Sequence, residues 1–234
     1  FVFVPNRYVY DQRIIVFNID KYDYYAVLNS CIHESWVYKF AGSVGGTTIN
    51  YSPNYLFETF SFPNLFDSNI SDSLSSIARI LFSSLVELLE DLYIGLTKIY
   101  NLYHLKNLSL DSKHVTFEED TISFDKAIEG IVKLRELHLQ MDNAVLKAYG
   151  WSDVELRHDF YEVDYLPEND RVRFTIHPEA RKEILKRLLE LNHKIHDEEV
   201  KAGLWDKKKA VSKKSQSLEV KEPEIGYGLF DKEK

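Results

Sequence analysis

Two histidines in the C-terminal third of the chain have the spacing of metal ligands. His193 and His196 are three residues apart in a segment predicted to be helical, with Glu190 and Glu199 on either side. Side chains three residues apart share one face of a helix, and imidazole and carboxylate groups together can bind Zn²⁺. The same pattern is typical of a charged helical face in contact with water. We adopt this second interpretation and predict no metal site.

Other patterns associated with catalysis are incomplete. Residues 41–48, AGSVGGTT, superficially resemble a phosphate-binding loop, but no lysine precedes the hydroxyl side chains and the segment follows a predicted helix. The pair His33-Glu34 lacks the second histidine of a zinc protease helix. Cys31 falls on an amphipathic helix, where we expect a small buried residue rather than a nucleophile. These segments therefore predict no catalytic site.

Charge and composition limit the classes of function. The chain has 234 residues, a formal net charge of −8 and 44% hydrophobic residues, as in an ordinary globular protein. Residues 1–66 carry four basic and five acidic side chains, a net of −1, so the first third permits contact with DNA. No apolar run is long enough to cross a bilayer, and we expect no membrane contact. A single cysteine, Cys31, excludes an internal disulfide and suits the cytoplasm.

The first third is predicted to be a small mixed domain rich in aromatic residues. It holds 17 of the 32 aromatic side chains. Residues 1–5 and 7–19 have the β-branched and aromatic pattern of strands. A helix is expected over 22–41 with Asp20 as its cap, followed by a glycine-rich loop, a short strand over 47–53 and an aromatic segment. The apolar stripe of this helix consists of Tyr25, Leu28, Ile32, Trp36 and Phe40.

Helices are expected from residue 71 onward. A long helix over 71–105 begins at Ser71 or Asp72, and its length predicts a kink or break near Gly95. Its apolar stripe consists of Ile77, Leu81, Leu85, Leu88 and Leu92. Residues 106–122 are predicted to be a polar connection with a small strand at HVTF.

Two further helices are predicted, over 124–149 and 179–202, each followed by a glycine. The intervening residues 151–178 are expected to be irregular, with turns at their prolines. The predicted fold class is therefore α+β, in which a small aromatic-rich mixed α/β domain precedes a bundle of long helices. The predicted domain limits are 1–66, 67–203 and a loosely ordered tail over 204–234.

Four blocks of the chain resemble one family of enzymes. The first runs from LNSCIHESW to ETFSFP over residues 28–63, and the second is LYIGLTKIYNLYH at 92–104. The third is LRELHLQMDNAVLKAYGW at 134–151, and the fourth, RVRFTIHPEARKEILKRLLELNHKIHDEE, begins at Arg171. They are similar to blocks of single-chain restriction–modification DNA adenine methyltransferases (type IIG and IIL, MmeI-like) and of related phage-defence methylases. The blocks occur in the family's order and cover most of residues 25–203.

The resemblance implies a catalytic domain that this chain does not contain. A full-length relative would bind S-adenosylmethionine and methylate adenine N6 through a separate N-terminal domain of the same polypeptide. That reaction uses a Pro-Pro loop to hold the flipped adenine, and none of the six prolines here forms a Pro-Pro pair. The chain also begins without a start methionine, so we interpret it as a piece of a longer protein. We expect this piece to have no methyltransferase activity and no cofactor of its own.

What the resemblance assigns to this region is recognition of double-stranded DNA. Glycines flanked by short polar side chains allow the backbone to approach DNA closely, so we predict base contacts from Thr47, Thr48 and Asn50. Phosphate contacts are predicted for three basic residues of the first third. These are Arg7, Arg13 and Lys39. The aromatic residues Tyr51, Phe57, Phe60 and Phe62 are expected to be core rather than base-stacking groups.

Two alternatives remain beside DNA recognition. The helical half carries the other −7 of the net charge, which favours a protein partner over DNA. It could therefore act as a docking or coupling scaffold of the same kind of enzyme, with little DNA contact of its own. A free-standing hydrolase or metalloenzyme has only His193 and His196 in its favour.

Overall fold

The computed structural model describes residues 1–4, 7, 9–11, 14–44, 48–108 and 124–204. The fold is α+β, as predicted, with helices and two small antiparallel sheets among the described residues. Phe1–His193 forms one compact unit and Lys194–Lys234 a second, so in packing the first third is not separate from the helices that follow it. Whether residues 1–66 and 67–203 differ in function stays a prediction. The predicted tail lies almost entirely outside the described residues.

None of the helices in the described part of the chain combines the length and the apolar character that a membrane crossing requires.

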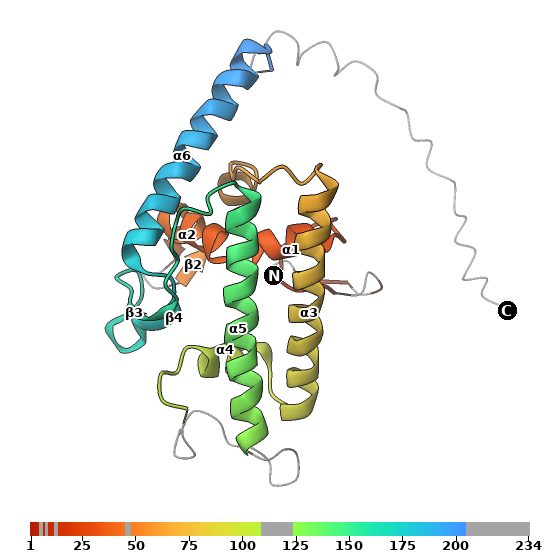
Figure 1. Cartoon of the computed structure of the whole chain (residues 1–234), viewed down its shortest axis with the longest axis vertical. Helices are drawn as coiled ribbons and strands as arrows, with labels where there is room; N and C mark the ends of the chain where they lie inside the picture. Colours follow the sequence, from red (N-terminus) through yellow and green to blue (C-terminus); the bar gives the residue numbers. More distant parts are fainter. Residues whose placement is uncertain (5–6, 8, 12–13, 45–47, 109–123, 205–234) are drawn as a thin grey trace, which may run out of the picture. The chain divides into compact units, whose positions relative to one another are not determined.

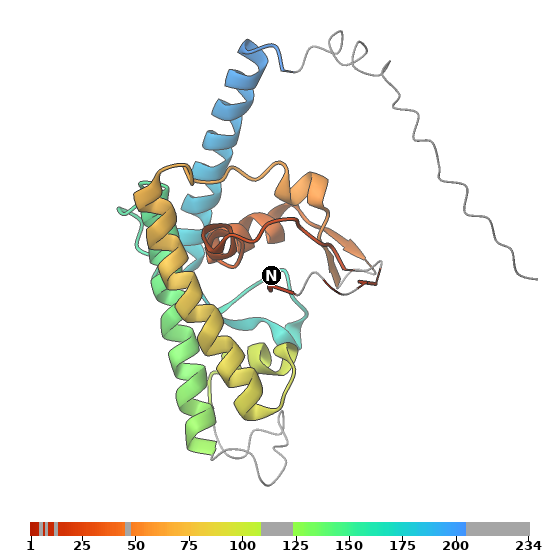
Figure 2. The same cartoon turned by 90° about the vertical axis from the view of Figure 1, so that its right-hand side faces the viewer.

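Two long helices form the centre of the first unit. Helix α3 (Ser68–Leu92) and helix α5 (Phe124–Ala148) run side by side in both views (Figures 1 and 2). The predicted stripe of α3 is confirmed, because Leu81, Leu85, Leu88 and Leu92 are buried and Ile77 packs against the core. The side chains of α5 that complete this core are Ile131, Leu134, Leu137, Met141 and Val145.

Helix α3 begins earlier than predicted. Its N-cap is Asp67, whose carboxylate accepts hydrogen bonds from the backbone N–H groups of Asn69 and Ile70. Ser71, one of the two predicted caps, instead donates its hydroxyl to the buried carboxylate of Asp23 at 2.7 Å. This bond joins α3 to the helix over Tyr22–Leu28 (α1).

The predicted break in the long helix is confirmed. Tyr93 ends α3 in the left-handed conformation, and α4 (Leu96–Tyr103) begins after Gly95. The last carbonyls of α4 are then satisfied by one side chain of α5. Arg135 donates to the carbonyl oxygens of Leu102, Tyr103 and Leu105 at 3.2, 2.9 and 2.7 Å.

The single helix predicted over 22–41 is wrong, because α1 and α2 (Cys31–Phe40) are separate. Ser30 lies between them in an extended conformation and caps α2 with its hydroxyl. Asp20 is not a cap, since the N-cap position of α1 is Lys21. The apolar stripe survives the break: four of its five side chains are buried, and the fifth, Phe40, is exposed.

The predicted strands over 1–5 and 7–19 are also wrong where the structure describes them. Residues 1–4 and 14–19 have no helix or strand and pair with no strand of the described chain. Their aromatic side chains pack on the helices instead, as when Phe3 stacks on Tyr25 with ring centroids 5.1 Å apart. The pattern of β-branched and aromatic residues therefore reports half-buried side chains rather than sheet hydrogen bonds.

The segment predicted to be irregular contains a second hairpin. Strand β3 (Asp159–Glu162) pairs antiparallel with β4 (Val172–Thr175), with Phe160 opposite Phe174. A short 3₁₀ turn, Glu168–Asp170 (η2), lies between them. Helix α6 (Pro178–Lys201) follows β4 and confirms the third predicted helix.

The three hydrogen bonds from Arg135 predict a large loss of stability on its replacement. Arg135→Met removes the three hydrogen bonds to the carbonyl groups of Leu102, Tyr103 and Leu105, so we expect the free energy of unfolding to fall by about 2–4 kcal/mol. Arg135→Lys should recover little of this, because one ammonium cannot reproduce a planar fork. Urea unfolding followed by circular dichroism measures both. The control is Lys133→Met on the exposed side of the same helix, and an equal loss in this control would contradict the assignment.

Candidate functional site

The predicted DNA-reading segment forms a two-stranded antiparallel ribbon. Strand β1 (Gly42–Val44) pairs with β2 (Thr48–Asn50), with Gly42 opposite Asn50 and Val44 opposite Thr48. The glycine-rich loop predicted here is thus partly a strand. Asn50 is exposed, as a base-reading residue must be.

A buried histidine anchors the ribbon to α2. Tyr51 follows β2 directly, and its hydroxyl lies 3.2 Å from Nε2 of His33. Nδ1 of His33 lies 3.0 Å from the carbonyl oxygen of Leu28, which only accepts, so Nδ1 carries the proton and Nε2 accepts from Tyr51. Burial lowers the pKa of His33 to about 4. The imidazole is therefore neutral at pH 7, as this pair of bonds requires.

The other predicted contact residues are only partly described. Lys39 lies in the last turn of α2 and is exposed, and Arg7 is exposed as well. Thr48 is placed as a residue of β2. Thr47 and Arg13 lie outside the described residues. Lys39 therefore lies at the C-terminal end of the helix that leads into the ribbon.

The aromatic residues after the ribbon pack inward, as predicted. Phe60 is buried, and Tyr51 and Phe62 pack against the main core. Phe57 ends a short π-helical turn, Pro53–Phe57 (η1), and contacts Phe62 at 5.4 Å between ring centroids. Phe60 packs against α2, with its ring centroid 4.8 Å from His33 and 6.1 Å from Trp36.

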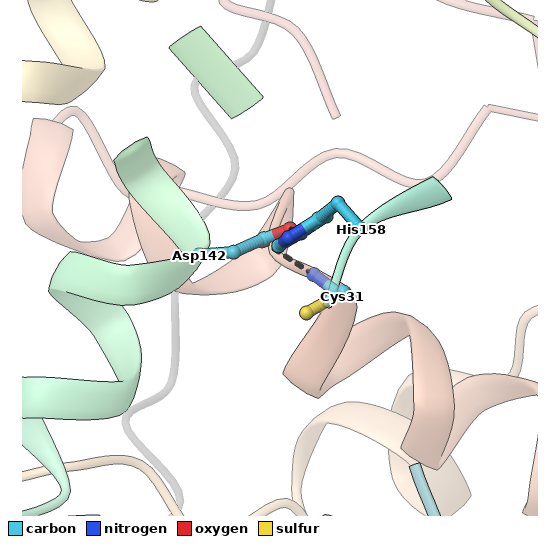
Figure 3. A group of neighbouring side chains, drawn as sticks. All are labelled: Cys31, Asp142 and His158. Atoms are coloured by element: carbon cyan, nitrogen blue, oxygen red, sulfur yellow. Dashed lines mark hydrogen bonds and ion pairs between the residues drawn. The ribbon is translucent and has the colours of Figure 1, made fainter. Parts of the chain in front are cut away.

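A buried carboxylate fixes the N-terminal end of α2 (Figure 3). Oδ1 of Asp142, on α5, accepts the backbone N–H of Cys31 at 2.8 Å. Oδ2 of Asp142 accepts from Nε2 of His158 at 2.8 Å, just before β3. The first N–H groups of a helix have no partner within the helix, so this carboxylate satisfies one that would otherwise be buried alone. One side chain thus ties together α2, α5 and the segment that leads into β3.

The same three residues have the types of metal ligands, but their hydrogen bonds need no ion. One ligand atom from each of Cys31, Asp142 and His158 lies within 4.8 Å of the others. Burial, with the nearby charge of Asp142, raises the pKa of the Cys31 thiol well above its usual value, so it is neither a ready ligand nor a nucleophile. Both oxygens of Asp142 already accept hydrogen bonds. His193 and His196, the pair considered from the sequence, are exposed and are not part of this group.

A cavity opens beside α2, and the sequence did not predict it. We call it the tyrosine cavity; its volume is about 580 Å³. It is lined by side chains from α2, from β3 and the residues after it, and from the start of α6. Its charged and tyrosine residues are Tyr38, Lys39, Tyr161, Glu162, Asp164, Tyr165, Arg181 and Lys182. The signal in the sequence was only local: Pro178 predicts a helix start, with Arg181 and Lys182 in its first turn.

The neutral state of His33 predicts that stability depends on pH. The pKa of His33 is about 4 in the folded state and ordinarily about 6.5, so the unfolded chain binds the proton more readily. Its contribution is complete above about pH 6.5 and is lost as pH falls toward 4, a loss of roughly 2 kcal/mol by pH 4.5. Urea unfolding between pH 7.5 and 4.5 should show a smaller loss in His33→Gln than in the parent. Parallel losses would contradict a neutral His33.

The bonds of Asp142 predict a graded series of variants. Asp142→Ala leaves the N–H of Cys31 and the ring of His158 unpaired in the interior, and we expect a loss of about 3–5 kcal/mol in the free energy of unfolding. Asp142→Asn keeps an acceptor for Cys31 and should cost less, about 1–2 kcal/mol. Thermal and urea unfolding measure the series, with Glu129→Ala, exposed on the same helix, as control. If Asp142→Asn loses as much free energy of unfolding as Asp142→Ala, the hydrogen bond accepted from the N–H of Cys31 is not what Asp142 contributes.

A comparison with protein-family models, curated proteins and solved structures finds no match to this chain. Its function is therefore inferred from its own residues and their geometry.

Proposed function

We propose that this chain recognises DNA sequence as the non-catalytic part of a restriction–modification adenine N6 methyltransferase. The observation that carries the proposal is the two-stranded ribbon of β1 and β2, on which Asn50 is exposed, together with the exposed Lys39 in the last turn of α2. The ribbon would position double-stranded DNA for base flipping by a methyltransferase domain of the same polypeptide. S-adenosylmethionine would bind in that domain and not in this chain. The setting would be the cytoplasm.

The dimensions of DNA support this use of the ribbon. The major groove of B-DNA admits a two-stranded β-ribbon, and an asparagine side chain can bond both N6 and N7 of an adenine. A lysine at the base of the ribbon would contact phosphate, which sets the register of the protein without reading sequence. Asn50 and Lys39 have these two chemistries. Lys39 lies in the last turn of α2 and Asn50 ends β2, with β1 between the two elements.

The way in which the ribbon is anchored also supports the proposal. Base reading requires that the reading side chains be held in place by well-packed neighbours. Tyr51 anchors the end of β2 to His33, and Asp142 fixes the start of the helix that carries His33. The contacts that hold the ribbon are therefore buried or partly buried, whereas Asn50 remains exposed.

The scaffold alternative is favoured by a different observation. Several polar residues of α5 are used for joining other elements of the chain, as Arg135 and Asp142 show. A helix with so many internal bonds suits a part that couples two regions of an enzyme. The scaffold role requires no DNA contact, so a DNA-binding experiment distinguishes it from DNA recognition.

The first test is sequence discrimination by Asn50. Duplexes selected from a randomised library by the parent chain should bind Asn50→Ala with reduced preference over scrambled duplexes. One bidentate base contact is worth roughly 1–3 kcal/mol, so we expect the preference to fall by about 5- to 150-fold. Asn101→Ala on α4, where the side chain is also exposed, is the matched control. Failure of the parent chain to select any sequence would favour the scaffold role.

The second test is the salt dependence of DNA binding at Lys39. Lys39→Ala should weaken binding to all duplexes alike and reduce the slope of log K against log salt by about 0.9, the value for one phosphate contact. Fluorescence anisotropy at several salt concentrations measures this slope. Lys98→Ala, an exposed lysine of α4, should leave it unchanged. An unchanged slope in Lys39→Ala would remove Lys39 from the interface.

A further inference from the structure

One wall of the tyrosine cavity is a fixed pair of aromatic rings. Tyr38 and Tyr165 are stacked with ring centroids 3.8 Å apart and an interplanar angle of 21°. The guanidinium group of Arg181 lies over the ring of Tyr165 at 5.2 Å and donates a hydrogen bond to its hydroxyl at 2.6 Å. Arg181 also donates to Oγ1 of Thr175 at 2.8 Å, which fixes the guanidinium itself. Rigid aromatic rings of this kind are platforms on which nucleobases stack.

Positive charge gathers along the same cavity from two helices. Lys39 lies in the last turn of α2, and Arg181 and Lys182 lie in the first turns of α6. Lys182 is exposed and pairs with Glu179 at 2.8 Å, so a phosphate would share this ammonium group with that carboxylate. The N-terminal end of a helix adds positive potential, and Pro178, the first residue of α6, also lines the cavity. The two hydrogen bonds described for Arg181 use two of its five N–H donors. Lysine, arginine and a helix N-terminus are the groups that bind phosphate in proteins.

Two carboxylates make the cavity unsuitable for an anion alone. Glu162, at the end of β3, and Asp164 line it together with the basic residues. They would repel a phosphate placed against them. Carboxylates do, however, accept hydrogen bonds from the amino groups of nucleobases. The mixture of charges therefore suits a ligand with an anionic end and an aromatic end that carries an amino group.

We propose that the tyrosine cavity binds a nucleotide, with its base against the tyrosines and carboxylates and its phosphate at Lys39, Arg181 and Lys182. The volume of about 580 Å³ lies within the range of roughly 300–1,000 Å³ that small-molecule sites occupy. The nucleotide is either a free mononucleotide or one unit of a DNA strand, since the chemistry is the same. The proposal goes beyond sequence recognition by the ribbon and does not require it.

Calorimetric titration of the full chain tests the proposal with four probes. We expect dAMP and dCMP to bind, and dTMP, whose base has no exocyclic amino group, to bind more weakly. Inorganic phosphate alone should bind at least about tenfold more weakly than dAMP, because it makes no stacking contact. Equal binding of phosphate and dAMP, or no binding of dAMP at millimolar concentration, would overturn the proposal.

Two substitutions change the cavity in different ways. Lys182→Glu reverses an exposed charge and should weaken dAMP binding about tenfold or more. Leu185→Trp places a large side chain into the cavity and should abolish dAMP binding, with circular dichroism showing that the fold is retained. Lys186→Glu makes the same charge change on the next exposed position of α6, which does not line the cavity, and should bind dAMP as the parent does. Binding that survives both cavity substitutions would overturn the proposal.

A competition experiment distinguishes the two sources of the nucleotide. A single-stranded oligonucleotide that displaces dAMP in the parent, but no longer binds Leu185→Trp, identifies a unit of a strand. If dAMP binds and the oligonucleotide does not compete, the ligand is a free nucleotide. Both results support the cavity as a nucleotide site. Asn50 does not line the cavity, so Asn50→Ala should bind dAMP as the parent does. The dAMP result therefore tests the cavity independently of base reading by Asn50.

Discussion

The carboxylate of Asp142 is the constraint on which the arrangement of α2 depends. Helix α2 begins inside the protein, where its first N–H groups have no water to bind. The hydroxyl of Ser30 accepts one of them, and Asp142 accepts the N–H of Cys31. Because the second oxygen of Asp142 is bonded to His158, the same side chain also fixes the approach to β3. A buried carboxylate is tolerated only when both oxygens are satisfied in this way, so the position of α2 relative to α5 has little freedom.

Both candidate sites depend on that position, because α2 contributes to each. Its last turn leads into the ribbon through Lys39, and one of its faces supplies Tyr38 to the tyrosine cavity. The opposite face carries Ile32 and Trp36 into the core. A shift of α2 would therefore move the ribbon and the cavity wall together. The network of buried polar bonds around α2 contributes to a single geometry for both surfaces as well as to stability.

The sequence predicts what depends on near neighbours along the chain. The long helices, the break near Gly95 and the inward-facing aromatic residues follow from apolar spacing and from glycine, which are local signals. The break at Ser30 was missed although serine is a capping residue, because the apolar stripe continues across it. The tyrosine cavity could not be predicted, since it pairs residue 38 with residue 165 and no spacing encodes that contact. Base-reading positions were placed on the ribbon by composition and resemblance, and two of the six predicted contact residues lie outside the described chain.

The polar residues inside α5 explain why its sequence is more varied than packing alone requires. Arg135, His138 and Asp142 follow one another at steps of three and four, so they lie on one side of the helix. Two of them bond α4: Arg135 donates to carbonyl groups at its end, and His138 bonds the hydroxyl of Tyr100 at 3.0 Å. Asp142 accepts a hydrogen bond from the start of α2. Burial lowers the pKa of His138 to about 4, so its imidazole is neutral at pH 7. An apolar face would allow neighbouring helices to slide, whereas three separate bonds fix the register of two elements at once. The polar residues of the segment 134–151 are thus explained by the bonds that join α5 to other parts of the chain.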